Sequence, residues 1–285
     1  MSGSFEVLKP GALTTVQDLG RPGFAHLGIP RSGAADRSSL RLANRLVGND
    51  EGAAALECTL IGPSLRFSKD AVIAVTGAPT AVRVNGEEMA INSAINVPAG
   101  ATVEIGTAER ALRSYLAVAG GVEVAAVMGS RSTDLLSGLG PTPLKAGVVV
   151  EVGSPTGAAP PVGAAPVAPP AQEPLLHVTR GPRADWFDDE ALGRLTSTPW
   201  EVSNDSNRSG VRLIGEQLNR GRHDELLSEG MAHGAIQVPP SGQPIILLAD
   251  HPTTGGYPVI AVVSSNDLDA AGQLRPGQRL RFALS

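Results

Sequence analysis

Short apolar segments bounded by turn-forming residues restrict most strongly what this chain can fold into. Four of them contain only four or five apolar residues each and are closed by Gly, Pro or Asp, namely residues 72–75, 115–118, 245–248 and 259–263. Runs of this length are typical of buried strands and are short for regular helices. One in five of the 285 residues is Gly (34) or Pro (23), which implies frequent turns between short elements. The sequence therefore predicts a mainly β protein.

Only a few segments carry a helical pattern. An amphipathic helix is predicted over residues 36–48, with Asp36 as its N-cap and Gly48 at its end. A second helix is predicted to hold acidic residues 188–190 in its first turn, and a third, short one to cover residues 267–274. Alternating, half-buried strands are expected at residues 82–86, 102–105 and 279–282. Strands separated by turns favour barrels or sandwiches over a doubly wound parallel sheet.

The charge balance and the single cysteine limit the partners and the compartment. The formal charge is −5, from 23 basic and 28 acidic residues, so no basic field is available for nucleic acid or an anionic membrane, and neither partner is expected. The apolar runs are far shorter than the ~18 to 20 residues that cross a bilayer. Residues 1–20 lack the pattern of a secretory signal. Cys58 is predicted to be a small buried residue on a strand, and these features predict a cytoplasmic protein.

A Pro- and Ala-rich segment divides the chain. Residues 153–174 contain seven Pro and three Gly, with Glu173 as the single charged residue. Such a composition is typical of a linker or a long surface loop. We therefore predict an N-terminal β domain over residues 1–152, a linker or loop over 153–174, and a C-terminal β domain over 175–285.

Common nucleotide and metal motifs are absent from the sequence. There is no Walker A sequence, no Gly-x-Gly-x-x-Gly before a helix and no His-Glu-x-x-His. The chain alone is not expected to bind ATP, a dinucleotide or catalytic zinc by those routes, and no metal ligands are predicted.

The first polar cluster covers residues 14–37, where polar side chains alternate with turn residues in a long structured loop. Loops of this kind commonly position binding groups. An alternative is that the acidic residues cap turns or helices, as is expected of Asp36, while the arginines pair with carboxylates. The candidates for a site in this cluster are Gln17, Asp18, Arg21 and His26.

The second polar cluster is Gly129-Ser130-Arg131-Ser132-Thr133-Asp134. Hydroxyl groups and an arginine beside a flexible turn can hold a carboxylate or a carboxyl phosphate. The alternative is a surface ion pair between Arg131 and Asp134, which contributes little free energy. Ser130, Arg131 and Thr133 are the candidates here.

Two further clusters lie in the C-terminal half. Residues 203–210 form an Asx-rich turn, most of which structure alone explains. Residues 249–258 lie between the two most apolar strands, where Asp250 and His251 have groups for proton transfer and Gly255-Gly256 permits close approach of an anion. Adjacent residues on a strand point to opposite faces, which argues against an Asp250–His251 relay. Gln237 and Gln243 lie just upstream and are expected near the same loop, as are Thr254 and Tyr257.

Several of these motifs together resemble the biotin-dependent carboxyltransferase family, which includes the C component of bacterial 5-oxoprolinase, also called allophanate hydrolase subunit 2 or kinase-inhibitor antagonist. The resemblance covers almost the whole chain and departs from the family at His251-Pro252, where many relatives carry Arg-Gln. The motifs that carry it include Leu13-Thr14-Thr15-Val16-Gln17-Asp18-Leu19-Gly20-Arg21-Pro22-Gly23, His26-Leu27-Gly28-Ile29-Pro30, Gly129-Ser130-Arg131-Ser132-Thr133-Asp134, Asn207-Arg208-Ser209-Gly210, Gly234-Ala235-Ile236-Gln237-Val238-Pro239 and Thr254-Gly255-Gly256-Tyr257-Pro258.

The resemblance implies a fold of cyclophilin-like β-barrels with a few short helices. It also implies two partner proteins of 5-oxoprolinase, the kinase-inhibitor-like B component and the A component, in the ATP-dependent opening of 5-oxo-L-proline to L-glutamate. The complex would use ATP, and no biotin is expected on this chain, because Lys9, Lys69 and Lys145 lack a Met-Lys-Met context.

Three functions follow as hypotheses. The first is a component of 5-oxoprolinase, with Asp18, Arg21, His26, Arg131 and Asp250 as catalytic candidates and a small-molecule substrate held by further residues. The second is a carboxyltransferase of the allophanate hydrolase or urea carboxylase type. The third is a regulatory protein without activity that binds and antagonises a histidine-kinase inhibitor. The candidates for substrate binding are Gln17, Ser130, Thr133, Gln237, Thr254, Gly255, Gly256 and Tyr257.

Overall fold

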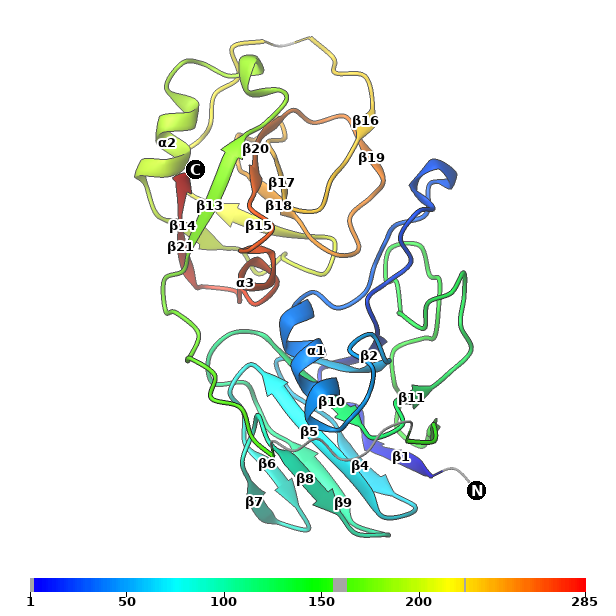
Figure 1. Ribbon diagram of the computed structural model, residues 1–285. Helices are drawn as coiled ribbons and strands as arrows, with labels where there is room; N and C mark the ends of the chain where they lie inside the picture. The colour runs from blue at the N-terminus through cyan, green and yellow to red at the C-terminus, as the bar shows by residue number, and fades with distance from the viewer. Residues whose placement is uncertain (1–2, 156–162, 223) are drawn as a thin grey trace. The chain divides into compact units, whose positions relative to one another are not determined.

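The computed structural model describes residues 3–155, 163–222 and 224–285, which form two compact units (Figure 1). The main boundary lies between Pro170 and Ala171, inside the segment predicted as a linker, of which residues 156–162 fall outside the described residues. The second unit also includes residues 22–31 and 135–137, which the predicted boundaries assigned to the N-terminal domain.

The first unit contains two sheets. One sheet has the strand order β11-β12-β1-β4-β9-β6-β7 and the other has the order β2-β3-β10-β5-β8. The strands are β1 (Ser4–Lys9), β2 (Leu13–Gln17), β3 (Ala55–Thr59), β4 (Ser64–Phe67), β5 (Ala71–Gly77), β6 (Val82–Val84), β7 (Glu87–Met89), β8 (Ala94–Val97), β9 (Thr102–Ile105), β10 (Arg113–Val118), β11 (Val122–Glu123) and β12 (Val149–Val152).

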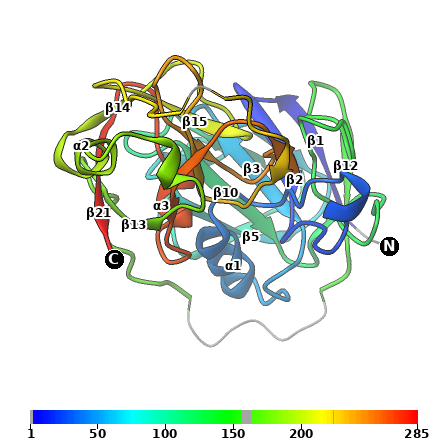
Figure 2. The ribbon, with the colours of Figure 1, turned by 90° about the horizontal axis from the view of Figure 1, so that it is seen from above.

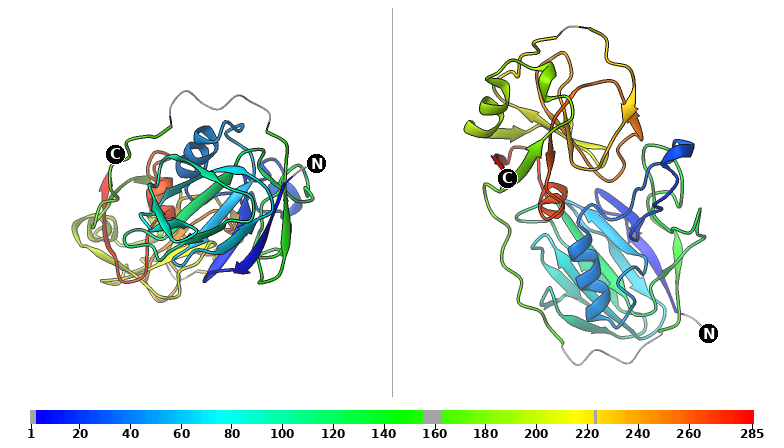
Figure 3. Two further views of the ribbon diagram at one scale, coloured as in Figure 1. Left: turned by 90° about the horizontal axis from the view of Figure 1, so that it is seen from below. Right: turned by 45° about the horizontal axis from the view of Figure 1, so that its top comes forward.

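The main core of this unit lies between the two sheets, where Phe5 and Phe67 of one sheet belong to the same buried cluster as Leu56 and Ile73 of the other. The outer face of the β2-β3-β10-β5-β8 sheet is covered by helix α1 (Arg37–Leu46), which packs on β5 and β10 (Figures 1 and 3). Both faces of β10 are therefore covered, and all six of its residues are buried. This explains its continuous apolar run, since a strand covered on both faces loses the alternating pattern.

The predicted helix over residues 36–48 is confirmed as α1. The Asp36 side chain caps it by accepting hydrogen bonds from the Ser39 backbone N–H (2.9 Å) and the Ser39 hydroxyl (2.6 Å). Gly48 follows the last turn with a φ of +76°, the left-handed conformation that glycine adopts at helix ends.

The second unit is a closed barrel with the strand order β13-β20-β17-β18-β15-β14-β21, closed by the parallel pair of β13 and β21. A two-stranded ribbon of β16 and β19 accompanies it. The strands are β13 (Leu175–Arg180), β14 (Trp200–Val202), β15 (Gly210–Ile214), β16 (Glu229–Gly230), β17 (Ala235–Gln237), β18 (Ile245–Leu247), β19 (Thr254–Gly255), β20 (Val259–Val263) and β21 (Arg279–Leu284).

Large apolar side chains fill the barrel, among them the fully buried Trp200 and Phe282. Helix α2 (Ala191–Ser197) lies on the outside next to β14 and β21 (Figure 2), and α3 (Leu268–Gly272) is the short helix predicted near the C-terminus. Two 3-10 turns, η1 (Ala25–Leu27) and η2 (Ala184–Trp186), complete the helical elements of the described residues.

The second predicted helix is shifted relative to its prediction. α2 begins at Ala191, so the acidic residues 188–190 precede its first turn. Asp188 instead accepts hydrogen bonds from Arg194 (2.5 and 2.6 Å), and this arginine holds the pKa of Asp188 below its usual range. The mainly β prediction is confirmed, with every predicted strand present. Within the described residues no helix has the length and apolar character needed to cross a membrane.

Cys58 lies buried on β3, as predicted, and its burial raises the pKa of the thiol to about 12. We expect the native protein to resist a thiolate-specific reagent at pH 8, because the reactive thiolate is not formed. Ellman's reagent should react with one thiol per chain only when denaturant unfolds the first unit. Rapid labelling of the native protein would contradict this burial. The contribution of Cys58 to stability is complete below its unfolded pKa near ~8.5 and declines as the pH rises toward 12.

Candidate functional site

Asp18, at the end of β2, organises the first unit's polar loops. Its Oδ1 accepts hydrogen bonds from the Gly20 N–H (2.7 Å) and from the hydroxyls of Ser130 (2.7 Å) and Ser132 (2.5 Å). Its Oδ2 accepts one from the backbone N–H of Arg131 (2.6 Å). Four donors on one buried carboxylate hold the first and second polar clusters together. We therefore expect Asp18 to position these loops.

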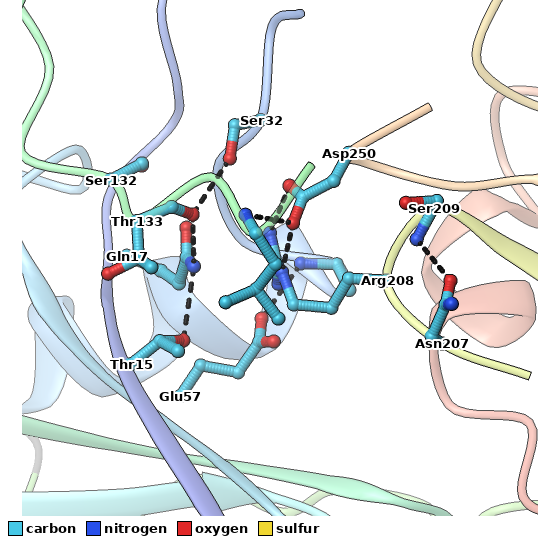
Figure 4. Close-up of polar contacts among 12 residues, drawn as sticks. Thr15, Gln17, Ser32, Glu57, Ser132, Thr133, Asn207, Arg208, Ser209 and Asp250 are labelled. Carbon is cyan, nitrogen blue, oxygen red and sulfur yellow. Dashed lines mark hydrogen bonds and ion pairs between the residues drawn. The ribbon is translucent and has the colours of Figure 1, made fainter. Parts of the chain in front are cut away.

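Gln17 and Arg21 reach the backbone of the same loop from either side of Asp18. Gln17 Nε2 donates to the Thr133 carbonyl oxygen (2.9 Å) and to the Thr15 hydroxyl (3.1 Å) (Figure 4). Arg21 Nη2 donates to the Ser132 carbonyl oxygen (2.5 Å). Both side chains are buried. Gln17 Oε1 and Arg21 Nη1 are buried and have no hydrogen-bond partner among the described residues.

In the second polar cluster, the two hydroxyl groups predicted to bind substrate are engaged within the fold. Ser130 donates to Asp18, and the Thr133 hydroxyl donates to the Pro141 carbonyl oxygen (2.8 Å). Ser32, whose backbone is left-handed at a φ of +54°, donates its hydroxyl to the Thr133 carbonyl oxygen (3.0 Å). A non-glycine residue in this conformation marks a backbone that its surroundings hold in place.

The Arg131 side chain is partly exposed and turns toward β11. Its Nε donates to the Val124 carbonyl oxygen (2.9 Å), and its Nη2 pairs with Glu123. The surface ion pair considered for this arginine therefore forms with Glu123 of β11. Because the guanidinium is partly exposed, an incoming anion can compete with Glu123 for it.

Gly140 permits the close approach of the Ser132 loop to Arg21. Its φ is +81°, and a Cβ atom there would lie 2.1 Å from the Ser132 carbonyl oxygen. We expect Gly140→Ala to displace that carbonyl and to lower the midpoint of thermal unfolding clearly more than Gly138→Ala. Gly138 is the matched control, since its φ is +73° and a Cβ atom there would meet nothing within 4 Å. Its replacement costs only the ~1 to 2 kcal/mol of left-handed backbone. Equal shifts for both variants would contradict the predicted clash.

A second buried network in the first unit surrounds Glu57 of β3. Glu57 Oε2 accepts hydrogen bonds from the Tyr115 hydroxyl (2.8 Å) and the Ala35 N–H (3.0 Å), and Arg113 Nε lies 3.5 Å from Oε1. The Tyr115 hydroxyl in turn accepts from the Asp36 N–H (2.8 Å). Burial, with the charge of Glu57 next, raises the pKa of Tyr115 well above its ordinary value, so the phenol stays a donor. Glu57 was not among the predicted site residues, and its one signal in the sequence is a charge between Leu56 and Cys58 in a strand.

Asp250 of the second unit forms a buried ion pair with Arg208. Arg208 Nε and Nη2 donate to the two carboxylate oxygens at 2.9 Å each, and the side chains are 2% and 0% exposed (Figure 4). The Leu135 N–H also donates to Asp250 (3.2 Å). Arg208 lies in the Asx-rich turn, where Asn207 Oδ1 accepts from the Ser209 N–H (2.8 Å). This turn was interpreted as mainly structural, and the structure shows that it presents Arg208 to Asp250.

His251 follows Asp250 but faces different groups. Its Nδ1 lies 2.7 Å from the Pro252 carbonyl oxygen, and its ring stacks on that of His233 with centroids 6.3 Å apart. Burial lowers the pKa of His251, which keeps the imidazole neutral at pH 7. The expectation against an Asp250–His251 relay agrees with these contacts. His26, the remaining catalytic candidate, lies exposed on η1.

The loop from β19 to β20 brings together several predicted binding residues. Gln237 Nε2 donates to the Tyr257 carbonyl oxygen (3.2 Å) and contacts Met231 Sδ (3.1 Å). A Cβ atom on Gly255 would lie 2.7 Å from Gln237 Nε2, so the Gln237 amide would have to move to admit a side chain there. Thr254 is exposed, and Gly256 lies next to the Leu226 carbonyl oxygen. Gln243 lies elsewhere, bonded to the backbone of Gly215, so its predicted place near this loop was wrong.

Arg220 belongs to this loop region although no sequence motif pointed to it. Its Cζ lies 6.0 Å from the centre of the half-exposed Tyr257 ring, and its Nη2 donates to the Val238 carbonyl oxygen (2.5 Å). No cluster of three or more His, Cys, Asp or Glu side chains suited to a metal ion occurs in the described part of the chain. The candidate residues described above supply arginine donors, amides, backbone N–H groups and buried carboxylates.

Comparison with known proteins places this chain among carboxyltransferase domains. The family model for the carboxyltransferase domain, subdomain A and B, matches residues 27–284. The chain is 39% identical to the C component of 5-oxoprolinase from Escherichia coli K12 over 280 residues, which are 97% of this chain and 90% of that protein. It is also 37% identical to urea amidolyase of Lachancea kluyveri, over 98% of this chain and 17% of that protein.

Solved structures share the fold. The crystal structure of TTHA0988 superposes with a TM-score of 0.91 at 40% identity, covering 98% of this chain and 55% of that one. The crystal structure of the K. lactis urea amidolyase superposes with a TM-score of 0.92 at 35% identity, covering 99% of this chain and 18% of that one. The chain thus spans nearly all of the E. coli protein, about half of TTHA0988 and less than a fifth of the urea amidolyases.

Proposed function

Because this chain belongs to the carboxyltransferase domain family of subdomains A and B, we propose that it is the C component of an ATP-dependent 5-oxoprolinase. The observation that carries the proposal is the match in length. The similarity to the E. coli protein extends over 97% of this chain and 90% of that protein, so the two correspond over nearly their whole lengths. The urea amidolyases correspond to this chain over one segment only.

The proposed reaction opens the lactam of 5-oxo-L-proline. The ring C–N bond breaks, water supplies the hydroxyl group to the carbonyl carbon and a proton to the nitrogen, and hydrolysis of ATP to ADP and phosphate drives the step. Opening an amide places negative charge on the carbonyl oxygen, which cationic and N–H donors stabilise. Arg21 Nη1 is a donor of this kind, and Gln17 Oε1 is an acceptor that suits an amide N–H.

The complex, and not this chain alone, is proposed to carry out the reaction. We assign ATP to the complex assembled with the kinase-inhibitor-like B component and the A component of 5-oxoprolinase, because this chain has no nucleotide-binding motif. We also propose that the chain carries no attached biotin. The predicted substrate-binding residues Thr254, Gly255, Gly256 and Tyr257 remain candidates in this scheme.

A second candidate function is a carboxyltransferase that acts in urea metabolism. The urea amidolyase comparisons favour it, with 37% identity to one such protein and a TM-score of 0.92 to another over nearly the whole chain. Urea, allophanate and 5-oxoproline all contain an amide carbonyl beside N–H, so the same donor and acceptor groups fit each of them.

Arg131→Ala separates an enzyme component from a regulatory binding protein. We expect kcat of the assembled complex to fall by about 10- to 100-fold, since a cationic donor near a reaction centre contributes on that scale. Arg66→Ala is the control, because Arg66 is an exposed arginine of the same unit at 3.7 Å from Glu6. Size-exclusion chromatography should show an intact complex for both variants. Unchanged kcat for Arg131→Ala in an intact complex would favour the regulatory function.

Product analysis on the assembled complex tests the substrate. The three proteins are supplied with ATP and 5-oxoproline, and glutamate is measured; in separate reactions they receive carboxybiotin with urea, and allophanate is measured. We expect glutamate from 5-oxoproline and no allophanate above background from urea. Allophanate from urea and carboxybiotin, without glutamate from 5-oxoproline, would transfer the assignment to the second candidate.

A further inference from the structure

Arg220 has a positive charge without an ion-pair partner in the described residues. The neighbouring arginines of the second unit are paired: Arg183 with Glu229, Arg194 with Asp188, and Arg222 with Asp185 at 3.6 Å. Arg220 instead contacts the Val238 carbonyl oxygen and the Tyr257 ring. Its Nε is buried and has no hydrogen-bond partner among the described residues. Burial lowers the pKa of this guanidinium, because the charged form loses solvent.

An unpaired, partly desolvated charge costs free energy that proteins normally offset with a counter-charge. No acidic residue among those that the structure describes forms an ion pair with Arg220. The contacts it does make hold the guanidinium in a fixed place, with Nη2 on Val238 and Cζ near the Tyr257 ring. A guanidinium that is held in place and lines a cavity is suited to an oxyanion, which it binds through directed hydrogen bonds.

A cavity of about 510 Å³ lies against Arg220. Its polar lining includes Gln217, Asn219 and Ser241, whose side chains all have N–H or O–H donors, and none of its lining residues is acidic. Ser241 Oγ accepts from the Gln243 N–H (3.4 Å), which leaves its own O–H to donate. Gln217, Asn219 and Ser241 are exposed, so the cavity opens to solvent. Its volume is in the range of small-molecule sites.

We propose that Arg220 and this cavity form a binding subsite for an oxyanion of a small molecule, a carboxylate or a phosphate. The subsite lies beside the predicted binding loop, since Tyr257 contacts Arg220 and Gln237 bonds to the Tyr257 carbonyl oxygen. Which molecule carries this oxyanion rests on the proposed function. For a 5-oxoprolinase, the oxyanion is either the carboxylate of 5-oxoproline or a phosphate of the nucleotide. A carboxylate subsite would discriminate against urea, which is uncharged.

The subsite is tested on the full chain by following the Arg220 Nε–H resonance in NMR spectra during titration with acetate and inorganic phosphate. The resonance is assigned by its loss in Arg220→Lys. We expect a saturable shift with at least one of the two anions. Arg220→Met should weaken binding of that anion at least about tenfold, measured by calorimetry, because charge-assisted hydrogen bonds are lost. Arg222→Gln, in the same loop but exposed and paired, should bind like the wild type.

Two further ligands distinguish the sources. A shift with 5-oxoproline but not with 2-pyrrolidone, its analogue without a carboxylate, identifies the substrate carboxylate. A tighter response to phosphate and ATP than to 5-oxoproline identifies a nucleotide phosphate. The proposal is overturned if neither anion shifts the resonance, or if Arg220→Met binds both as well as the wild type. Anion binding is measured without turnover. Anion binding at Arg220 can therefore be observed even if the complex has no 5-oxoprolinase activity, and that activity can be observed even if Arg220 binds no anion.

Discussion

Replacing Asp250 with Ala is expected to lower the free energy of unfolding of the barrel unit by about 3 to 5 kcal/mol. The carboxylate accepts two hydrogen bonds from Arg208, and both side chains are buried. Its removal takes from the buried Arg208 guanidinium the charge and the two hydrogen bonds that Asp250 supplies, in a place that water does not reach. Such a loss is a large share of the ~5 to 15 kcal/mol that stabilises a typical domain.

Tryptophan fluorescence during urea unfolding measures this effect selectively, because the chain's two tryptophans, Trp186 and Trp200, both lie in the second unit. Asp185→Ala is the control, since it removes an exposed carboxylate 3.6 Å from Arg222 and should cost ~0 to 1 kcal/mol. The double variant Arg208→Met/Asp250→Leu should recover much of the loss, because both charges are removed together. A cost for Asp250→Ala no greater than that of the control would contradict the buried pair.

Asp18→Asn is expected to lower both stability and activity. In the wild-type protein, N–H and O–H donors of the loop bond to both carboxylate oxygens of Asp18. In the variant an NH2 group replaces one of these oxygens, so at least one of the donors loses its acceptor. We estimate a loss of about 2 to 4 kcal/mol for the first unit, since hydrogen bonds to a charged group contribute ~1.5 to 3 kcal/mol each. Displacement of residues 130–132 should lower kcat of the complex by about 100-fold.

The reactivity of Cys58 in increasing urea reports unfolding of the first unit, in which this thiol is buried. Asp70→Asn is the control, because Asp70 Oδ1 accepts a single exposed hydrogen bond, from the Ala99 N–H (2.7 Å). If Asp18 were instead a catalytic acid or base, activity would vanish while the Cys58 reactivity curve stayed that of the control. That combination would contradict the positioning role.

Local sequence signals were sufficient for the elements of the fold. Apolar runs between turn residues located the strands, and Asp36 with Gly48 located α1, because caps and periodicity act over a few residues. The same reasoning placed the start of α2 too early. In the sequence, acidic residues that precede a helix cannot be told apart from acidic residues in its first turn. In this chain they precede the helix, and Asp188 forms an ion pair with Arg194.

The partners of the polar residues could not be predicted, because they are distant in sequence. Asp18 meets Ser130 across 112 positions, and Arg208 meets Asp250 across 42. Pairing at such separations is decided by sheet topology, which no local pattern encodes. The sequence therefore marked Asp18 and Asp250 as unusual residues, but it did not reveal that donors occupy both carboxylates. Glu57, Arg208 and Arg220 escaped prediction for the same reason.

Titration of this chain into its proposed partners tests the central claim most directly. The A and B components of 5-oxoprolinase are held at fixed concentration with ATP and 5-oxoproline, and glutamate release is measured as the chain is added. We predict no release without the chain, an increase with each addition, and saturation at a fixed stoichiometry. Full glutamate release by the two partners alone, unchanged by addition of the chain, would contradict the claim.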